Sequence, residues 1–183
     1  MEKAKLILDS KRFALTIDRL SYELVENHGD FSHSCIIGIQ DGGVILMDKI
    51  LKALNEKSNI SNILNGKLDI TFYRDDFRKS SHPIKASSTE MDFLVEGRRV
   101  ILVDDVLYTG RTILAAMTAL LDFGRPASIE LLTLIDRRFN RHIPIQADYL
   151  GMAIDTMDHS YVKVEWDSKG NSDCVRMLKE KKN

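Results

Sequence analysis

The sequence predicts an α/β fold with a mostly parallel central sheet flanked by helices. Short apolar runs rich in β-branched residues, typical of strands buried on both faces, alternate with longer segments of helical periodicity. This alternation favours parallel strands joined by right-handed crossovers. The chain has 183 residues, of which 44% are hydrophobic, so we expect a single domain over residues 1–183 with a sizeable core.

The first half of the chain contains the signals of two helices and two strands. Asp9 or Ser10 can cap a first helix, and Gly29 can close it. Apolar residues of this segment recur on one helical face, at Phe13, Ile17, Leu20 and Leu24. The signals that follow are an apolar strand at 34–39, a glycine turn at 40–43, a helix over 44–54 and a strand at 69–73.

The second half begins with a long polar segment at 74–97, which has little periodicity. A segment of this length inside a compact domain is usually a functional loop, and we expect it to be flexible. Residues 100–103 indicate a buried strand, and residues 113–123 indicate the helix after it. Further strands are predicted at 128–135, at 147–152, and in a terminal hairpin of 162–166 and 174–178.

Bulk properties exclude several classes of protein. A net charge of −1 provides no global field that would attract nucleic acid, so any RNA affinity must come from a local patch. Cys35 and Cys174 lack metal or redox spacing and are expected to be reduced. The sequence has no signal peptide at its start and no run of transmembrane length, which predicts a cytoplasmic protein.

The stretch from Val100 to Thr112 carries the clearest chemical signal. Asp104 and Asp105 follow the strand, at the edge where open α/β sheets bind ligands. A hydroxyl-bearing turn then precedes a helix, whose unpaired N–H groups and positive dipole end favour a phosphate. The segment between the carboxylates and the helix is Val106, Leu107, Tyr108, Thr109, Gly110, Arg111 and Thr112. Carboxylates that accept sugar hydroxyls, beside a phosphate-binding turn, predict a sugar-phosphate site.

Each of these features also has an ordinary structural explanation. Paired aspartates at a strand end commonly cap a turn or a helix, and a lone Thr109-Gly110 would fit any β–α turn. Charged runs such as 74–76 and 137–142 are most often solvated surface. The functional interpretation is favoured because all parts of the pattern occur together in one stretch.

The same stretch resembles the thirteen-residue phosphoribosyl-pyrophosphate motif of the type I phosphoribosyltransferases. Further blocks resemble one branch of them, the bifunctional pyrimidine-operon attenuator and uracil phosphoribosyltransferase family. These blocks are 68–76, 124–126, 135–137 and 144–149. The resemblance implies a type I phosphoribosyltransferase fold and transfer of ribose 5-phosphate from phosphoribosyl pyrophosphate to a pyrimidine base. It points to uracil as the base, to Mg²⁺ held mainly by phosphoribosyl pyrophosphate and water, and to a homodimer or higher homo-oligomer.

The resemblance also implies roles for individual residues. At least one of Asp104 and Asp105 would accept hydrogen bonds from the ribose hydroxyls, and residues 108–112 would bind the 5′-phosphate. Arg74 would approach the pyrophosphate from a loop that folds over the substrate. Two further sets are implied beside the base and the pyrophosphate: Asp136 and Arg137 at a strand end, and Ile154, Asp155 and Thr156 in the uracil-recognition segment.

Tyr108 separates this chain from purine-specific relatives. Those enzymes commonly carry an aspartate immediately before the Thr-Gly turn, where it handles a purine N7 proton. Tyrosine cannot serve as that base at neutral pH, because its reference pKa is about 10. The residue therefore favours a pyrimidine over hypoxanthine or guanine.

The chain departs from the family at its first glycine turn. Asp41, Gly42 and Gly43 follow Gln40 where Lys-Thr-Arg-Gly is usual, so two cations are lost and a carboxylate is gained near the expected pyrophosphate site. Positions that are cationic or polar in RNA-binding relatives hold Asp18, Tyr22, Asn27, Gln146 and Met152, although Arg19 remains. Because phosphate contacts supply most RNA affinity, we expect weak or absent RNA binding. Two alternatives stay open: a nucleotide-sensing RNA-binding regulator with little turnover, and a phosphoribosyltransferase for another base.

Overall fold

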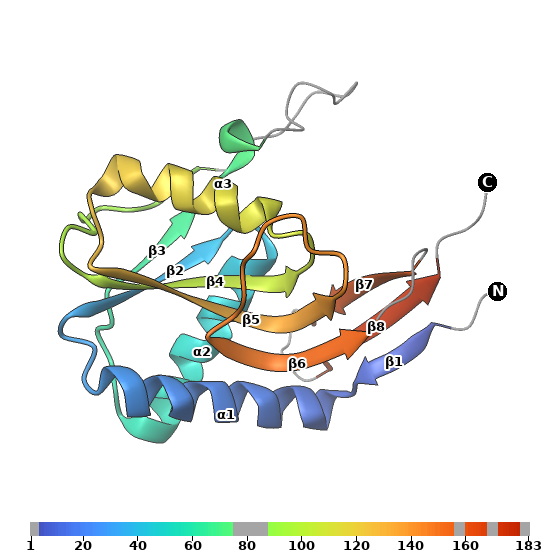
Figure 1. Cartoon of the computed structure of the whole chain (residues 1–183). Coiled ribbons are helices and arrows are strands. Elements are labelled where there is room, and N and C mark those ends of the chain that lie inside the picture. Colours follow the sequence, from blue (N-terminus) through green and yellow to red (C-terminus); the bar gives the residue numbers. More distant parts are fainter. Residues whose placement is uncertain (1–3, 75–87, 156–159, 168–171, 180–183) are drawn as a thin grey trace.

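The computed structural model describes residues 4–74, 88–155, 160–167 and 172–179, and it contains two sheets (Figure 1). A five-stranded parallel sheet has the order β3-β2-β4-β5-β6, and a three-stranded antiparallel sheet has the order β1-β8-β7. The strands are β1 (Lys5–Leu8), β2 (Ser34–Ile39), β3 (Asn65–Leu68), β4 (Arg99–Leu107), β5 (Ser128–Arg138), β6 (Tyr149–Asp155), β7 (Ser160–Glu165) and β8 (Cys174–Lys179). The helices are α1 (Ser10–His28), α2 (Gly42–Ser58), α3 (Arg111–Leu120) and the 3-10 turns η1 (Thr71–Tyr73) and η3 (Leu121–Phe123).

Helices cover both faces of the parallel sheet, which confirms the predicted fold class. Figure 1 shows α3 on one side of the sheet and α1 and α2 on the other. Alternate residues of β4 accordingly enter two cores: Ile101 and Val103 pack with α1 and α2, whereas Val100 and Leu102 pack with α3. Among the described residues, no helix is long and apolar enough to cross a membrane. Both cysteines are free and buried.

The first two helices begin and end for identifiable reasons. Asp9 caps α1 by accepting from the Arg12 N–H at 2.8 Å, and Gly29 ends it by donating to the Val25 carbonyl, as predicted. Helix α2 begins at Gly42, two residues earlier than expected. A Cβ on Gly43 would overlap the Val103 carbonyl oxygen, so only glycine allows the start of α2 to approach β4 this closely.

Two predictions about the edges of the fold were wrong. Residues 69–73 are not a strand, because β3 ends at Leu68 and Thr71–Tyr73 form η1. The Asp69 carboxylate accepts from the N–H of Thr71 at 2.8 Å and from its hydroxyl at 2.5 Å, which bends the chain out of the sheet. Strand β1 was not expected, and it forms only because β8 offers it an antiparallel partner.

The central strands extend beyond their predicted ends. Strand β4 runs to Leu107, so Asp104 and Asp105 lie within the strand, near its carboxyl end, rather than after it. Strand β5 runs to Arg138, and β4 pairs with it in parallel as far as Leu107 opposite Asp136. The helix expected over 113–123 divides into α3 and η3. The terminal hairpin is confirmed as β7 and β8, and its turn at 169–171 lies outside the described residues.

An ion pair ties the small sheet to the main body. Lys49 of α2 donates to Asp173, just before β8, at 2.5 Å, and only 8% of the Asp173 side chain is exposed. The second oxygen of Asp173 accepts from the Asp167 N–H at 2.9 Å, and the Lys49 ammonium also lies 5.9 Å from the centre of the Trp166 ring. These contacts hold the small sheet against α2, beside the carboxyl ends of the parallel strands (Figure 1).

A second buried polar network lies at the opposite end of the parallel strands. The Tyr149 hydroxyl donates to Glu130 at 2.7 Å, and His28 lies 3.1 Å from that hydroxyl and 2.8 Å from the Ser34 hydroxyl. Arg99 reaches Glu130 at 2.9 Å. Burial lowers the pKa of His28, which favours the neutral ring. The network joins α1, β2, β4, β5 and β6 at the end remote from the carboxylates.

Candidate active site

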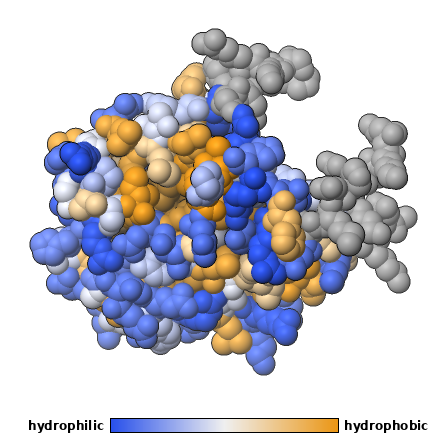
Figure 2. Space-filling model, in the orientation of Figure 1, coloured by the Kyte–Doolittle hydropathy of each residue, from blue (hydrophilic) through white to orange (hydrophobic). Residues whose placement is uncertain are grey.

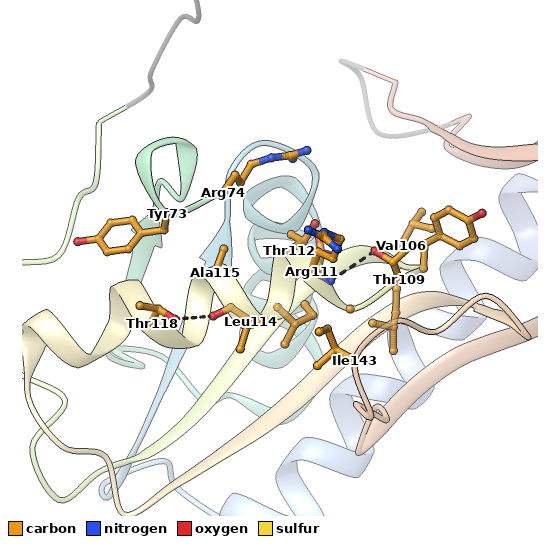
Figure 3. Close-up of a pocket in the computed structure, with 15 residues that line it drawn as sticks. Tyr73, Arg74, Val106, Thr109, Arg111, Thr112, Leu114, Ala115, Thr118 and Ile143 are labelled. Atoms are coloured by element: carbon orange, nitrogen blue, oxygen red, sulfur yellow. Dashed lines mark hydrogen bonds between the residues drawn. The ribbon is translucent and has the colours of Figure 1, made fainter. Parts of the chain in front are cut away.

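A cavity of about 420 Å³ opens at the carboxyl ends of the parallel strands, and its close-up appears in Figure 3. It brings together most of the residues that the sequence singled out. Arg74 extends over it from the end of η1, and the turn before α3 lines it from the other side (Figure 3). The lining residues are Tyr73, Arg74, Asp104, Val106, Leu107, Tyr108, Thr109, Gly110, Arg111, Thr112, Ile113, Leu114, Ala115, Thr118 and Ile143.

Asp104 is the buried carboxylate of this cavity. It is 8% exposed, and its carboxylate oxygen accepts from the N–H of Asp105 at 3.0 Å. Burial, followed by repulsion from Asp105, raises the pKa of Asp104 to about 8, and Arg74 acts in the opposite direction. A group held in this way readily accepts a cation or a hydrogen-bond donor, because either would relieve the cost of its buried charge.

Asp105 points to the other face of β4, toward the start of α2. A Cβ on Gly42 would overlap its carboxylate, so the glycine makes room for this acid. Burial raises the pKa of Asp105, whereas backbone N–H groups that include that of Val106 lower it. The positive end of the α2 dipole also favours the ionised form. The two adjacent aspartates therefore occupy different environments, and only Asp104 lines the cavity.

The turn before α3 presents backbone N–H groups rather than a capping side chain. Gly110 has φ +86° and stands at the N-cap of α3, where it offers no side-chain acceptor. The N–H of Arg111 lies 3.4 Å from the Thr109 hydroxyl, a long contact that an incoming anion could replace. This geometry suits a phosphate, whose oxygens would accept from backbone amides at the positive end of the helix.

The glycine turn at Asp41, Gly42 and Gly43 lies next to the carboxylates but does not line the cavity. The Gln40–Asp41 peptide bond is cis. Asp41 is exposed and its side chain forms no cap on α2. The Gln40 amide donates to the Ser88 carbonyl at 2.9 Å, which joins this turn to the described end of the long 74–97 segment. Residues 75–87 of that segment lie outside the described residues.

Asp136 and Arg137 lie inside β5, and each is 7% exposed. The Arg137 guanidinium stacks 3.8 Å from the centre of the Tyr108 ring and donates to the Ser160 carbonyl at 2.6 Å. Asp136 faces Arg141 at 2.5 Å. Neither residue lines the cavity directly, but both support the segment that does.

Ile154 lies on β6, where its backbone is in register with Arg137 and its side chain packs against the core. Its neighbour Asp155 forms a two-point ion pair with Arg138, at 2.7 and 2.9 Å. Thr156, the third residue of the expected base-recognition segment, lies outside the described residues. The structure thus brings Ile154 beside Arg137 at the end of the sheet but does not make it part of the described cavity wall.

Several residues near the site were missed by the sequence analysis. Tyr73 and Ile143 line the cavity, together with apolar residues of α3. Arg141 contacts both Asp136 and the Tyr108 carbonyl. It stands in a basic run that resembles ordinary solvated surface, and nothing in its local sequence indicates the strand partner that it reaches.

Comparisons with known proteins agree with this geometry. A family model described as a phosphoribosyl transferase domain matches residues 3–169. The chain is 43% identical over 160 residues to the bifunctional protein PyrR of Haemophilus ducreyi, which covers 87% of this chain and 88% of the relative. It is 41% identical over 175 residues to the bifunctional protein PyrR of Desulfosudis oleivorans, with 96% of each chain covered.

Solved structures share the fold at lower identity. A hypoxanthine phosphoribosyltransferase of Trypanosoma cruzi matches with a TM-score of 0.68 and 17% identity, over 97% of each chain. A hypoxanthine phosphoribosyltransferase of Staphylococcus aureus matches with a TM-score of 0.66 and 19% identity, over 86% of this chain and 80% of the other. At such identities the likeness concerns the fold, not the base that is bound.

Replacing Asp104 by asparagine tests its burial through the pH dependence of stability. The pKa of the folded protein, about 8, exceeds the value of about 4 in an unfolded chain, so the folded state holds a proton that the unfolded state releases. The stability of the metal-free wild type therefore falls as the pH rises through this range. We expect Asp104→Asn to raise the melting temperature by about 5 °C or more near pH 8.5, and by much less near pH 5.

The measurement is thermal unfolding followed by circular dichroism, without ligand and with a chelator present. Asp92→Asn serves as the control, because Asp92 is exposed and removal of its charge should leave the difference between the two pH values unchanged. An equal stabilisation by Asp104→Asn at both pH values would contradict the raised pKa.

Proposed function

Because the chain belongs to the phosphoribosyl transferase family, and within it to the bifunctional PyrR proteins, we propose that it transfers ribose 5-phosphate from phosphoribosyl pyrophosphate to uracil. The products would be UMP and pyrophosphate. The observation that carries the proposal is the single cavity in which Asp104 and the turn from Tyr108 to Thr112 lie together. A carboxylate for sugar hydroxyls and amides for a phosphate are the two groups that a ribose 5-phosphate requires.

The chemistry is displacement at the anomeric carbon through an oxocarbenium-like transition state. Asp104 would accept hydrogen bonds from the ribose hydroxyls, and Asp105 would support it from the α2 side of β4. The amides of the Thr109–Thr112 turn would hold the 5′-phosphate, and Arg74 would stabilise the negative charge of the leaving pyrophosphate. Positioning and charge stabilisation would then supply most of the rate.

Mg²⁺ fits the donor set of this site as a metal held mainly by the substrate. Within the described residues, no three acidic, histidine or cysteine side chains gather into a metal-binding cluster. Asp104 is nevertheless a carboxylate with a raised pKa that lines the cavity, and a divalent cation would relieve both the cost of burying its charge and its repulsion from Asp105. When bound, the metal would neutralise charge at the pyrophosphate, and Asp104 would coordinate it or accept hydrogen bonds from its water.

The stack of Arg137 on Tyr108 supports the choice of a pyrimidine. The tyrosine stands where purine enzymes commonly carry a carboxylate, and its ring is covered by the guanidinium at 3.8 Å. The side chain therefore provides no carboxylate to take up a purine N7 proton. Ile154 and the residues after it would supply backbone groups to the base, as the family resemblance implies.

The reaction is tested by following UMP formation from uracil and phosphoribosyl pyrophosphate in the presence of Mg²⁺. We expect the wild type to turn over and Asp104→Asn/Asp105→Asn to lose at least about a hundredfold in kcat/KM, because the ribose loses its charged acceptors. Asp92→Asn again serves as the matched control, since it removes an exposed carboxylate outside the cavity. Cytosine, orotate, hypoxanthine and guanine are assayed in parallel.

Two outcomes would contradict the proposal. Faster product formation with another base would mean that the enzyme acts on that base instead of uracil. If no base reacts while UMP still raises the melting temperature, the site binds nucleotide without turnover, as expected of a nucleotide-sensing regulator.

We also propose that RNA binding by this chain is weak. The arginines that could contact RNA phosphates are already engaged within the protein. Arg19 donates to Glu23 at 2.6 Å and to the carbonyls of Leu150 and Gly151 at 2.7 and 2.8 Å. Arg138 and Arg141 each form ion pairs with aspartates of the same region. Asp18 also attracts Lys57, at 2.5 Å, which leaves α1 with a neutralised outer surface.

RNA binding is tested by an electrophoretic mobility shift with a hairpin from a pyrimidine-operon leader. At about 0.15 M salt we expect a Kd no tighter than about 1 µM, equal to that for a scrambled hairpin, because Arg19, Arg138 and Arg141 are held by partners within the protein and do not displace counterions from the RNA. Nanomolar binding that discriminates between the hairpins and weakens steeply with salt would contradict this expectation and would favour the regulator.

The surface of α3 supports a homo-oligomer, which we propose as the state of this protein. Leu121, the first residue of η3 after α3, is 61% exposed, and Phe72 of η1 is 69% exposed. The Tyr73 hydroxyl donates to Asp122, so η1 lies beside η3 and these apolar side chains gather in one area. Figure 2 shows apolar surface on the face of the molecule that carries α3. An apolar area of this kind on a soluble chain is typical of a contact between copies.

Sedimentation equilibrium tests this state. We expect the wild type to have at least twice the mass of one chain, and Leu121→Glu to shift the equilibrium toward a single chain by burying a charge in the contact. Leu15→Glu is the control, because Leu15 is 59% exposed on α1, on the opposite side of the sheet. A monomeric wild type, or equal effects of the two variants, would contradict the proposal.

A further inference from the structure

The segment between β5 and β6 lies against the turn before α3 through contacts that the reaction described above does not use. The N–H groups of His142 and Ile143 both donate to the Thr109 carbonyl, at 2.9 and 3.1 Å. A Cβ on Gly110 would stand 3.1 Å from the Ile143 Cβ and 3.7 Å from the Arg141 Cδ. The segment is therefore packed closely on the phosphate-binding turn, with little room for a side chain at Gly110.

Arg141 makes the strongest of these contacts. One nitrogen of its guanidinium donates to the Tyr108 carbonyl, and the other lies 2.5 Å from the Asp136 carboxylate. The side chain of Arg141 is 21% exposed and that of Asp136 is 10% exposed. A charge-assisted contact that is mostly shielded from water is stronger and better oriented than one on the surface.

The contacts to the Tyr108 and Thr109 carbonyls determine the direction of the next amide in each case, that of Thr109 and that of Gly110. In a planar trans peptide the C=O and the N–H point in opposite directions, and the peptides on either side of Thr109 are trans. The Tyr108 carbonyl shares its peptide with the Thr109 N–H, and the Thr109 carbonyl shares its peptide with the Gly110 N–H. Both amides are consequently turned away from the 139–147 segment.

We propose that Arg141 is a positioning residue for phosphate binding, and that Asp136 acts through Arg141 rather than on the substrate. The Arg141 bridge, meaning its contacts to Asp136 and to the Tyr108 carbonyl, fixes the amides of Thr109 and Gly110 in the orientation that a 5′-phosphate requires. Glycine at 110 gives the turn conformational freedom, and the bridge removes it before the substrate arrives. This inference rests on the proposed phosphate site and goes beyond it by naming what orients the site.

The test compares Arg141→Met and Arg141→Lys with Arg138→Met. Arg138 is the matched control, because it is also an arginine near Asp136, two residues farther along β5. It pairs with Asp155 on the surface instead, and 53% of its side chain is exposed. Binding of phosphoribosyl pyrophosphate with Mg²⁺ is measured by titration calorimetry well below the melting temperature of each variant. The KM for each substrate and kcat are measured with uracil.

We expect Arg141→Met to weaken binding of phosphoribosyl pyrophosphate by about tenfold or more, with the KM for uracil changed by less than about threefold. Arg141→Lys should recover part of the loss, because an ammonium can reach one of the two acceptors but not both in fork geometry. Arg138→Met should bind as the wild type does. If Arg141 only stabilised the fold, Arg141→Met would lower the melting temperature and affect phosphoribosyl pyrophosphate and uracil alike. Equal weakening of the interactions with these two substrates would therefore overturn the proposal.

A double-mutant cycle tests the part assigned to Asp136. If this carboxylate acts through Arg141, Asp136→Asn/Arg141→Met will bind phosphoribosyl pyrophosphate no more weakly than Arg141→Met alone. A further loss in kcat in the double variant would place Asp136 on the substrate and overturn that assignment. Should Arg141→Met not fold, Arg141→Lys provides the same comparison. Absence of uracil turnover in the wild type would overturn the proposed reaction alone, since the binding measurement does not depend on it.

Discussion

A buried carboxylate, Asp104, and a half-buried one, Asp105, lie side by side in sequence near the end of β4, and the rest of the site depends on how their charge is accommodated. Burial and mutual repulsion raise the pKa of Asp104 to about 8, so the protein holds this acid at a cost in stability. The strand turns Asp105 toward Gly42 and the positive end of α2, while Asp104 faces the cavity and Arg74. The position of Asp104, buried at the wall of the cavity, is the physical basis of its proposed use as a sugar-binding group.

The phosphate-binding turn is organised from outside itself. Gly110 provides the positive φ at the start of α3, but a glycine by itself leaves the turn free to adopt other conformations. The segment between β5 and β6 restricts it through the amides of His142 and Ile143 and the guanidinium of Arg141. The proposed sugar-binding residues thus depend on β4, and the proposed phosphate-binding turn depends on the segment between β5 and β6, which follows it later in the sequence.

Several arginines in the described part of the chain serve its own carboxylates and carbonyls. Arg19 satisfies carbonyls on the free edge of β6, Arg99 and Glu130 pair at the remote end of the sheet, and Arg138 pairs with Asp155. Such pairing stabilises edges and strand ends, and it is the basis of the proposal that RNA binding is weak.

The sequence by itself determined the fold class, because strand periodicity and helix signals are local properties of the chain, and its resemblance to known proteins indicated the family. It also predicted that the segment from Asp104 to Thr112 forms a site, and most of this segment lines the cavity. It failed at residues 69–73, where the Asp69 side chain competes with the sheet for the backbone, and it missed β1, which needs β8 as its partner. The separation of Asp104 from Asp105 and the bridge from Arg141 to Tyr108 were decided only by the tertiary structure. Both depend on which surfaces α2 and the 139–147 segment bring against β4, and no local pattern in the sequence records such a contact between distant residues.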